Sequence, residues 1–220
     1  MQIKEKIGGT VTAISMGPIQ AVVSLRDALA RGADRALLLS DTAFAGADTL
    51  ATSYVLASAV RKLGAVNLVV CGEKTIDGDT AQVGPEVSEF LGFPCVAFVE
   101  QIQEVRKDSL VVKSRMGRKC YLLEVRLPGL ITVTKDINMP RLPTLKDKIR
   151  SRKAEVVLWN ADDVSDVANK EYFGLSGSPT SVIKVYAPST GGGRGQIIEG
   201  TSREKAKKIA SILKMLNIAR

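Results

Sequence analysis

Short apolar runs alternate with helical patterns through the first 91 residues of the chain. Residues 9–16, 35–40 and 66–71 predict strands, because they are apolar or β-branched and end at turn residues, and the last two are predicted to be buried. Helical patterns follow over residues 17–32, 48–64 and 84–91, and the first helix is predicted to bury a broad face of Ile19, Val22, Val23, Leu25 and Leu29. This alternation predicts an α/β fold with a doubly wound, Rossmann-like parallel sheet.

The loop after the third predicted strand has the composition of a phosphate-binding loop. Its glycines allow backbone N–H groups to approach an anion, and the helix that starts near Pro85 presents its positive N-terminus. The first strand ends at Ser15 and Met16, and ligands bind at the carboxyl ends of strands in such sheets. We therefore predict a nucleotide site formed by Ser15, Met16, Gly72, Thr75, Asp77, Gly78, Asp79, Thr80, Ala81, Gln82 and Val83.

A less specific interpretation of the same loop stays open. Strand-to-helix loops are rich in Gly, Asp and Thr because turns and helix caps favour these residues. The loop also lacks the Gly-x-Gly-x-x-Gly fingerprint of dinucleotide-binding folds and the Gly-Lys-Ser/Thr of a P-loop. From composition alone, a nucleotide-binding loop and an ordinary connection are about equally supported.

Beyond Pro94 the pattern changes. Residues 95–105, 110–115 and 120–126 predict an antiparallel hairpin insertion at about 95–126, and residues 130–134 predict a return to the core sheet. The prolines of residues 138–143 suggest a boundary, with a nucleotide-binding domain over 1–143 and a partner-recognition segment and C-terminal arm over 144–220. In that second part, the sequence predicts a basic helix at 144–152 and a strand at 155–159. A Ser/Gly-rich linker is predicted at 189–195, followed by a final amphipathic helix at 204–216. The apolar stripe of this helix is Ile209, Ile212, Leu213 and Leu216.

Composition excludes several classes of function. The chain has no histidine, which removes Ser–His and Cys–His catalysis and imidazole metal sites, so we predict no catalytic residue and no metal site. Cys71, Cys95 and Cys120 are scattered through apolar runs and are interpreted as buried thiols. The sequence shows neither a membrane-length apolar run nor a signal peptide, so a cytoplasmic location is expected, or an organelle matrix in a eukaryote.

The formal net charge of +8 is concentrated in two segments. Residues 141–153 contain six basic residues and one acidic residue, and residues 201–220 contain the same numbers. Such clustering favours docking surfaces or solvated helix faces over a domain built to bind nucleic acid, for which a 5% aromatic content is also low. We therefore expect neither nucleic-acid binding nor membrane insertion.

Specific motifs resemble a known family. Residues 77–85 read Asp-Gly-Asp-Thr-Ala-Gln-Val-Gly-Pro, which is similar to the nucleotide-binding loop of the beta subunit of electron transfer flavoprotein. The resemblance extends to residues 11–18, 28–35, 43–49, 124–133 and 177–182, and so covers nearly all of the chain. It implies a heterodimer in which a larger alpha subunit holds the electron-transferring FAD while this chain binds AMP or a second FAD in its own site.

The resemblance also implies how such a protein would act. The loop is closest in pattern to the Fix-type and electron-bifurcating group, in which a second flavin accepts a hydride from NADH. Electrons would pass between a dehydrogenase, or NADH, and a quinone oxidoreductase or other acceptor. The alternative is a stand-alone adenine-nucleotide-binding α/β protein, and co-purification of a flavin-bearing partner would separate the two hypotheses.

Two further expectations follow from the resemblance. Residues 140–153 match a recognition loop that docks the partner dehydrogenase, with Leu145 as an apolar anchor among Lys146, Lys148 and Arg150. The alternative is a solvated basic helix with Leu145 folded onto its own core. Family members also begin with a strand that precedes the segment found here, and residues 1–8 resemble the end of the helix after that strand. Without that strand we expect an exposed sheet edge or an open pocket.

Overall fold

The computed structural model describes residues 1–220 except 77, 187–194, 196 and 217–220. The chain forms two compact units, Met1–Ser181 and Val182–Arg220. This division lies beyond the 143/144 boundary suggested by the sequence. The physical reason is that residues after 143 complete the first unit: helix α5 (Leu145–Lys153) packs on helix α2 (Val22–Ala30), and strand β8 (Val157–Trp159) joins a sheet of the first unit.

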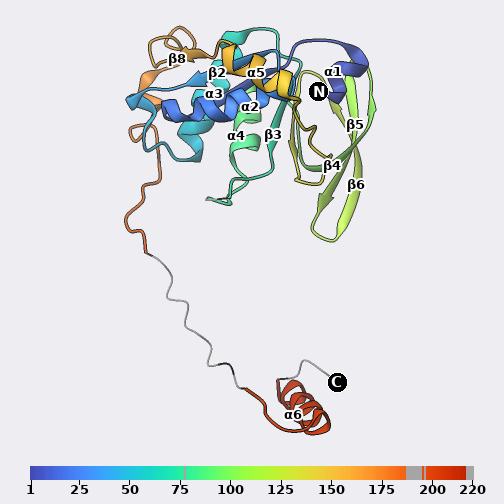
Figure 1. Ribbon diagram of the computed structural model, residues 1–220. Coiled ribbons are helices and arrows are strands. Elements are labelled where there is room, and N and C mark those ends of the chain that lie inside the picture. Colours follow the sequence, from blue (N-terminus) through green and yellow to red (C-terminus); the bar gives the residue numbers. More distant parts are fainter. Residues whose placement is uncertain (77, 187–194, 196, 217–220) are drawn as a thin grey trace. The chain divides into compact units, whose positions relative to one another are not determined.

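The first sheet has the strand order β1-β2-β8, in which β1 (Thr12–Met16), β2 (Arg35–Leu39) and β8 are parallel (Figure 1). Alternate residues of β2 point to opposite faces. Ala36 and Leu38 pack with α2, whereas Leu37 and Leu39 pack with helix α3 (Thr49–Leu63). Burial of β2 on both faces, predicted from its continuous leucines, is therefore confirmed.

The second sheet has the order β3-β7-β4-β5-β6. Strands β3 (Leu68–Gly72), β7 (Gly129–Val133) and the start of β4 (Cys95–Val105) are parallel, while β4, β5 (Ser109–Met116) and β6 (Lys119–Arg126) are antiparallel. The predicted antiparallel insertion is thus present. Helix α4 (Val83–Leu91) lies very close to this sheet, because Gly84 has no Cβ where one would collide with Thr132 of β7.

The parallel strands form two sheets where the sequence predicted one. Among the described residues, β1 pairs only with β2, and β3 pairs only with β7. Helix α3 connects the sheets through Leu56, which packs against the core clusters of both. The expectation that β3 is a buried strand is wrong, since Val70 is 52% exposed on a strand that has one neighbour.

The predicted buried face of the first helix also needs correction. The first helix buries Leu25 and Leu29 but leaves Val23 exposed, because only one stripe of α2 faces the sheet. Ile19 is exposed as well, in the short 3₁₀ helix η1 (Ile19–Ala21) that precedes α2.

The cysteines are not all buried. Cys95 is exposed as the first residue of β4, and Cys120 is exposed on β6, which ends the strand order of its sheet. Only Cys71 of β3 is largely enclosed, and this burial, followed by the influence of Cys95, raises the pKa of the Cys71 thiol to about 11. Such a pKa keeps this thiol protonated and unreactive at neutral pH.

Shorter elements complete the first unit. Helix α1 (Gln2–Ile7) is tied to the rest by ion pairs from Lys4 to Asp34 and from Arg141 to Glu5. The 3₁₀ helices η2 (Thr42–Phe44) and η3 (Lys170–Tyr172) lie on either side of an aromatic cluster in which Phe44 and Phe173 meet edge to face, with ring centroids 5.2 Å apart.

The second unit contains helix α6 (Ser202–Met215), which begins with a capping box between Thr201 and Glu204. None of its residues is buried, and the predicted stripe of Ile209, Ile212, Leu213 and Leu216 is at least partly exposed. The predicted linker at 189–195 lies outside the described residues except for Gly195. Within the described parts of the chain, no helix has the length and apolar character needed to cross a bilayer.

Candidate functional site

A cavity of about 650 Å³ lies at the carboxyl ends of β1 and β2. It is lined by Met16, Gly17 and Pro18 after β1, and by Ser40, Asp41, Thr42, Phe44, Ala45, Gly46 and Ala47 after β2. We call residues 40–47 the cavity loop. The position agrees with the general rule that ligands bind beyond the carboxyl ends of parallel strands, and the volume is within the range of small-molecule sites.

The cavity loop is held by contacts to distant parts of the chain. The Asp41 carboxylate accepts hydrogen bonds from the backbone N–H groups of Ala43 and Ala161, both at 2.9 Å. These bonds, the one from Ala161 first, hold the pKa of Asp41 below its usual value, because they favour the ionised carboxylate. Both oxygens of Asp41 are thus engaged in fixing the loop, and its role is to shape the cavity.

Gly46 brings the cavity loop against a segment more than a hundred residues later. Its φ is +72°, and a Cβ there would lie 2.7 Å from Cγ of Leu175. A side chain at this position would therefore meet both backbone strain and a steric collision. The cavity wall depends on this close approach.

The loop after β3 is built differently. We call residues 73–82 the exposed loop, since Ile76, Gly78, Asp79 and Thr80 are all exposed and it projects between β3 and α4 (Figure 1). The contacts described within it are local: Thr75 Oγ1 accepts from the Gly78 N–H at 3.3 Å, and Lys74 pairs with Asp79 at 2.6 Å. At the start of the loop, the Glu73 N–H donates to the Val133 carbonyl at 2.9 Å.

Two residues of the exposed loop have a backbone conformation that L-residues rarely adopt. Asp79 has a φ of +51° and Ala81 a φ of +58°. Non-glycine residues with positive φ carry strain and occur preferentially at functional positions. The exposed loop therefore carries backbone strain at two of its described positions.

The exposed loop ends beside the start of α3, which follows the cavity loop. Gln82 Oε1 lies 3.3 Å from Thr49 Oγ1, and the Glu86 carboxylate accepts a 2.8 Å hydrogen bond from Ser53 Oγ. The starts of α3 and α4 are therefore adjacent. Asp48 caps α3, whereas no side chain of the described residues caps α4, so its first N–H groups can serve an anion.

The structure thus brings together only part of the predicted site. Met16 lines the cavity, Ser15 precedes it within β1 without lining it, and Gly72 ends β3. Val83 begins α4, where its carbonyl accepts from Ser53, and Asp77 lies outside the described residues. The other predicted residues, Thr75, Gly78, Asp79, Thr80, Ala81 and Gln82, belong to the exposed loop. Of the ten predicted residues that the structure describes, Met16 alone lines the cavity.

Sequence reasoning missed the cavity loop. A signal was present, because Ser40 and Asp41 directly follow the most continuously apolar strand of the chain. The same rule that selected Ser15 and Met16 applies to this strand end. The signal is weaker because residues 40–47 contain one glycine, whereas residues 72–83 contain two.

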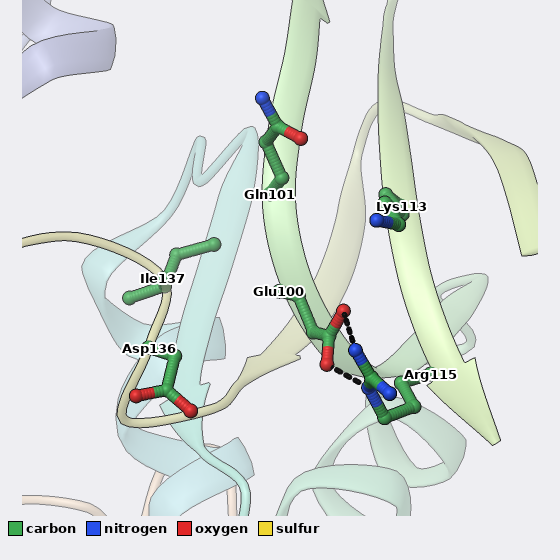
Figure 2. A pocket seen from close by; sticks show the side chains of 6 residues that line it. All are labelled: Glu100, Gln101, Lys113, Arg115, Asp136 and Ile137. Carbon is green, nitrogen blue, oxygen red and sulfur yellow. Dashed lines mark hydrogen bonds and ion pairs between the residues drawn. The ribbon is translucent and has the colours of Figure 1, made fainter. Parts of the chain in front are cut away.

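A second cavity, of about 460 Å³, lies on the hairpin side of the second sheet (Figure 2). Its lining residues are Glu100, Gln101, Lys113, Arg115, Asp136 and Ile137. Glu100 and Arg115 form a two-point ion pair that lowers the pKa of Glu100 and joins β4 to β5. The lining has two cations, Lys113 and Arg115, and two carboxylates, Glu100 and Asp136. Its formal charges cancel, so the cavity favours neither an anionic nor a cationic ligand.

Helix α5 carries the predicted partner-binding residues. Leu145 is 75% exposed, so it does not fold onto its own core, and Lys146, Lys148 and Arg150 are exposed around it. The helix starts with a capping box between Thr144 and Asp147. Met139, Leu142 and Ile149 add further exposed apolar surface, and we call the exposed residues of 139–150 the basic apolar patch.

Comparison with known proteins gives consistent matches along the chain. Residues 1–164 match the family described as electron transfer flavoprotein domain. The chain is 44% identical, over 97% of its length and 80% of the relative, to an electron transfer flavoprotein subunit beta of Thermoanaerobacterium thermosaccharolyticum. It is 40% identical to subunit CarD of the caffeyl-CoA reductase-Etf complex of Acetobacterium woodii (98% and 82% covered), and 39% identical to protein FixA of Bradyrhizobium diazoefficiens (96% and 75% covered).

Proposed function

The chain belongs to the electron transfer flavoprotein family, with beta subunits and FixA proteins as its relatives, and on that premise we propose that it is the smaller subunit of a heterodimeric electron carrier. Within this role it binds an adenine nucleotide in the cavity between β1 and β2, and it leaves the electron-transferring FAD to be shared with the alpha subunit. The redox chemistry belongs to the flavin, and the chain supplies binding and orientation.

The observation that carries the nucleotide proposal is the cavity next to the start of α4, which no side chain of the described residues caps. Met16 and Phe44 offer an apolar surface to a planar base, while the start of α4 and the exposed loop offer N–H and hydroxyl groups to phosphate. The adjacency of the starts of α3 and α4 allows one ligand to contact both regions. The volume of about 650 Å³ accommodates an adenosine-sized group.

The loop sequence favours a second FAD over AMP as the bound nucleotide, and counting cofactors tests this. The chain is co-expressed with its alpha subunit, and flavin and AMP are extracted and quantified per heterodimer. We expect two flavins and reduction by NADH. One flavin with one AMP would place the protein among simple carriers, and one flavin with no second nucleotide would contradict the proposed site.

Gly78→Val tests whether the exposed loop holds that nucleotide. A branched side chain prevents close backbone approach to a phosphate, so the second nucleotide should be lost while the shared FAD remains. Thr10→Val is the control, because Thr10 is exposed and outside both loops. Full retention of the second nucleotide by the Gly78 variant would exclude the loop as a phosphate site.

The basic apolar patch is proposed as the docking site for a partner dehydrogenase or quinone oxidoreductase. An exposed leucine that fills an apolar pocket contributes about 1.5–3 kcal/mol by burial, while the surrounding lysines and arginines steer encounter. Helix α6, which has no buried residue, is likewise available to a partner and is proposed to contact the alpha subunit.

Leu145→Ala in the assembled heterodimer separates docking from folding. Electron transfer to the partner should fall at least tenfold, since about 1.4 kcal/mol corresponds to a factor of ten, while flavin content and thermal stability stay unchanged. Leu122→Ala is the matched control, as Leu122 is an exposed leucine on β6. Loss of flavin or of the heterodimer in the Leu145 variant would show a structural role and refute docking.

A further inference from the structure

The segment that leads to the second unit is packed against the cavity loop. Gly174 has a φ of +51°, and a Cβ on it would collide with the carbonyl oxygens of Ala43 and Ala45. The next residue, Leu175, fills the space that Gly46 leaves open. Residues 173–180, which we call the exit segment, therefore form the outer side of the cavity wall.

Asp48 joins the exit segment to α3 through both its backbone and its side chain. Its N–H donates to Ser178 Oγ at 2.8 Å, and Ser178 Oγ in turn donates to the Gly174 carbonyl at 2.7 Å. Asp48 Oδ2 accepts from Thr180 Oγ1 at 2.8 Å and from the Thr180 N–H at 3.1 Å. The other oxygen, Oδ1, accepts from the Ala51 N–H at 3.0 Å and caps the helix.

The two carboxylate oxygens of Asp48 thus have separate tasks. Capping α3 needs Oδ1 alone, so the pairing of Oδ2 with Thr180 adds a connection that the helix itself does not require. Burial on its own would raise the pKa of Asp48, but the hydrogen bonds from Ala51 and Thr180 outweigh it and hold the pKa below its usual value. The carboxylate is therefore ionised, and its bonds to Thr180 are charge-assisted.

The bonds between Asp48 and Thr180 link the neighbourhood of the cavity to the end of the first unit. Ala47, the neighbour of Asp48, lines the cavity, and Thr180 is one residue from the end of the first unit. The chain then continues into Val182, Ile183, Val185 and Tyr186, which are strongly exposed, Ile183 at 96%. Contacts that fix residues 46–48 therefore also restrain Thr180, which lies just before the start of this apolar segment.

We propose that Asp48 and Thr180 couple the cavity to the C-terminal unit, so that a nucleotide in the cavity orders the exit segment and orders the start of the apolar segment 182–186. The ligand stabilises the cavity loop that it contacts, and this stabilised loop holds Thr180 more firmly. By linkage, a partner that immobilises residues 182–186 must tighten nucleotide binding by the same factor. The identity of the ligand rests on the proposed function, but the coupling is a separate claim.

Thr180→Val is the informative variant, because it removes the hydroxyl donor and retains the shape, the backbone N–H and the cap of α3. The full chain, unmodified or carrying Thr180→Val, is titrated with AMP and with FAD by calorimetry. Hydrogen exchange of residues 174–186 is measured with and without each nucleotide. Thr10→Val serves as the matched Thr-to-Val control, and circular dichroism checks the fold of each variant.

In the unmodified chain, nucleotide should slow exchange in residues 174–186. In the Thr180 variant this protection should disappear and the affinity should fall by about fivefold or more, the lower end of typical couplings between sites, while Thr10→Val changes neither. Unchanged affinity and unchanged protection in the Thr180 variant would overturn the coupling and leave the nucleotide site intact. No binding of either nucleotide to the unmodified chain would instead overturn the proposed site, and the coupling with it.

If Thr180→Val fails to fold, Ser178→Ala keeps the proposal testable. This variant removes the Ser178 oxygen that accepts from the Asp48 N–H, while the Asp48 carboxylate and both its partners remain. The coupling predicts a smaller but measurable loss of ligand-dependent protection in residues 174–186. Full protection in a folded Ser178 variant would contradict it.

Discussion

The cavity loop and the exposed loop occupy equivalent places after β2 and β3, yet they are held in opposite ways. Residues 40–47 are fixed by bonds and close packing to residues 161–175, far along the chain. Residues 73–82 are tied to distant parts of the chain at their two ends, through Glu73 with Val133 and Gln82 with Thr49, and the contacts described between those ends are local, Thr75 with Gly78 and Lys74 with Asp79. One loop is shaped by the fold, and the other is shaped by local sequence.

The difference separates two kinds of contribution to binding. A loop held by distant contacts has its shape set before a ligand enters, so the ligand restricts only the motion that remains in it. The exposed loop, with positive φ at Asp79 and Ala81, would gain most of its order from the ligand under the proposed function. We infer that the cavity loop sets where the nucleotide lies and the exposed loop sets how tightly its phosphates are held.

A matched pair of glycine substitutions should separate the loops most strongly. Gly46→Ala introduces a Cβ at positive φ and against Leu175, and overpacking of this kind typically costs about 1–3 kcal/mol. In Gly78→Ala the new Cβ lies at an ordinary 3.4 Å from Thr75 Oγ1, so the free energy of unfolding should change by less than about 0.5 kcal/mol. Urea unfolding measures both, and equal losses would remove the distinction between the loops.

Replacing one aspartate in each loop should give a smaller difference. Asp41→Asn exchanges a carboxylate that accepts two backbone N–H bonds for an amide with one oxygen, and a loss of about 1 kcal/mol is expected for a partly solvated group. Asp79→Asn removes only an exposed ion pair, so stability should be unchanged. Thermal unfolding at neutral pH provides the comparison.

The pH dependence of Asp41→Asn adds a check with a defined sign. The folded-state pKa of Asp41 is lowered, so its contribution is complete above the unfolded pKa of about 3.9 and is lost as the pH falls through the folded value. The gap in stability between the unmodified chain and the variant should therefore be constant near neutral pH and close below about pH 4. A gap that widens on acidification would contradict the role given to the Asp41 carboxylate.

The smallest expected effect concerns affinity alone. Thr80→Ala removes one hydroxyl from the exposed loop, which should weaken nucleotide binding by about 1 kcal/mol, the usual net value of one hydrogen bond. Unfolding in the absence of nucleotide should not change, because Thr80 is exposed. Calorimetry with AMP and with FAD measures the affinity, and a loss of stability without a loss of affinity would assign Thr80 to the fold.

Local patterns in the sequence determined the elements of this protein and their order. The apolar runs, the turn residues and the caps act over a few residues, so the strands, the helix from Asp48 to Gly64 and the antiparallel hairpin were all predictable. The motif at residues 77–85 also indicated the family, because its nine residues are specific by themselves, and the matches to known proteins along the chain confirm that family.

Only the tertiary structure decided how those elements meet. The division into two sheets, the exposure of Val70, Cys95 and Cys120, and the exposed position of Leu145 depend on which strands and helices are neighbours. The cavity loop depends on Asp41 reaching Ala161 and on Gly46 admitting Leu175. These pairs are separated by more than a hundred residues, so no local pattern encodes them, and the chain must fold before they form.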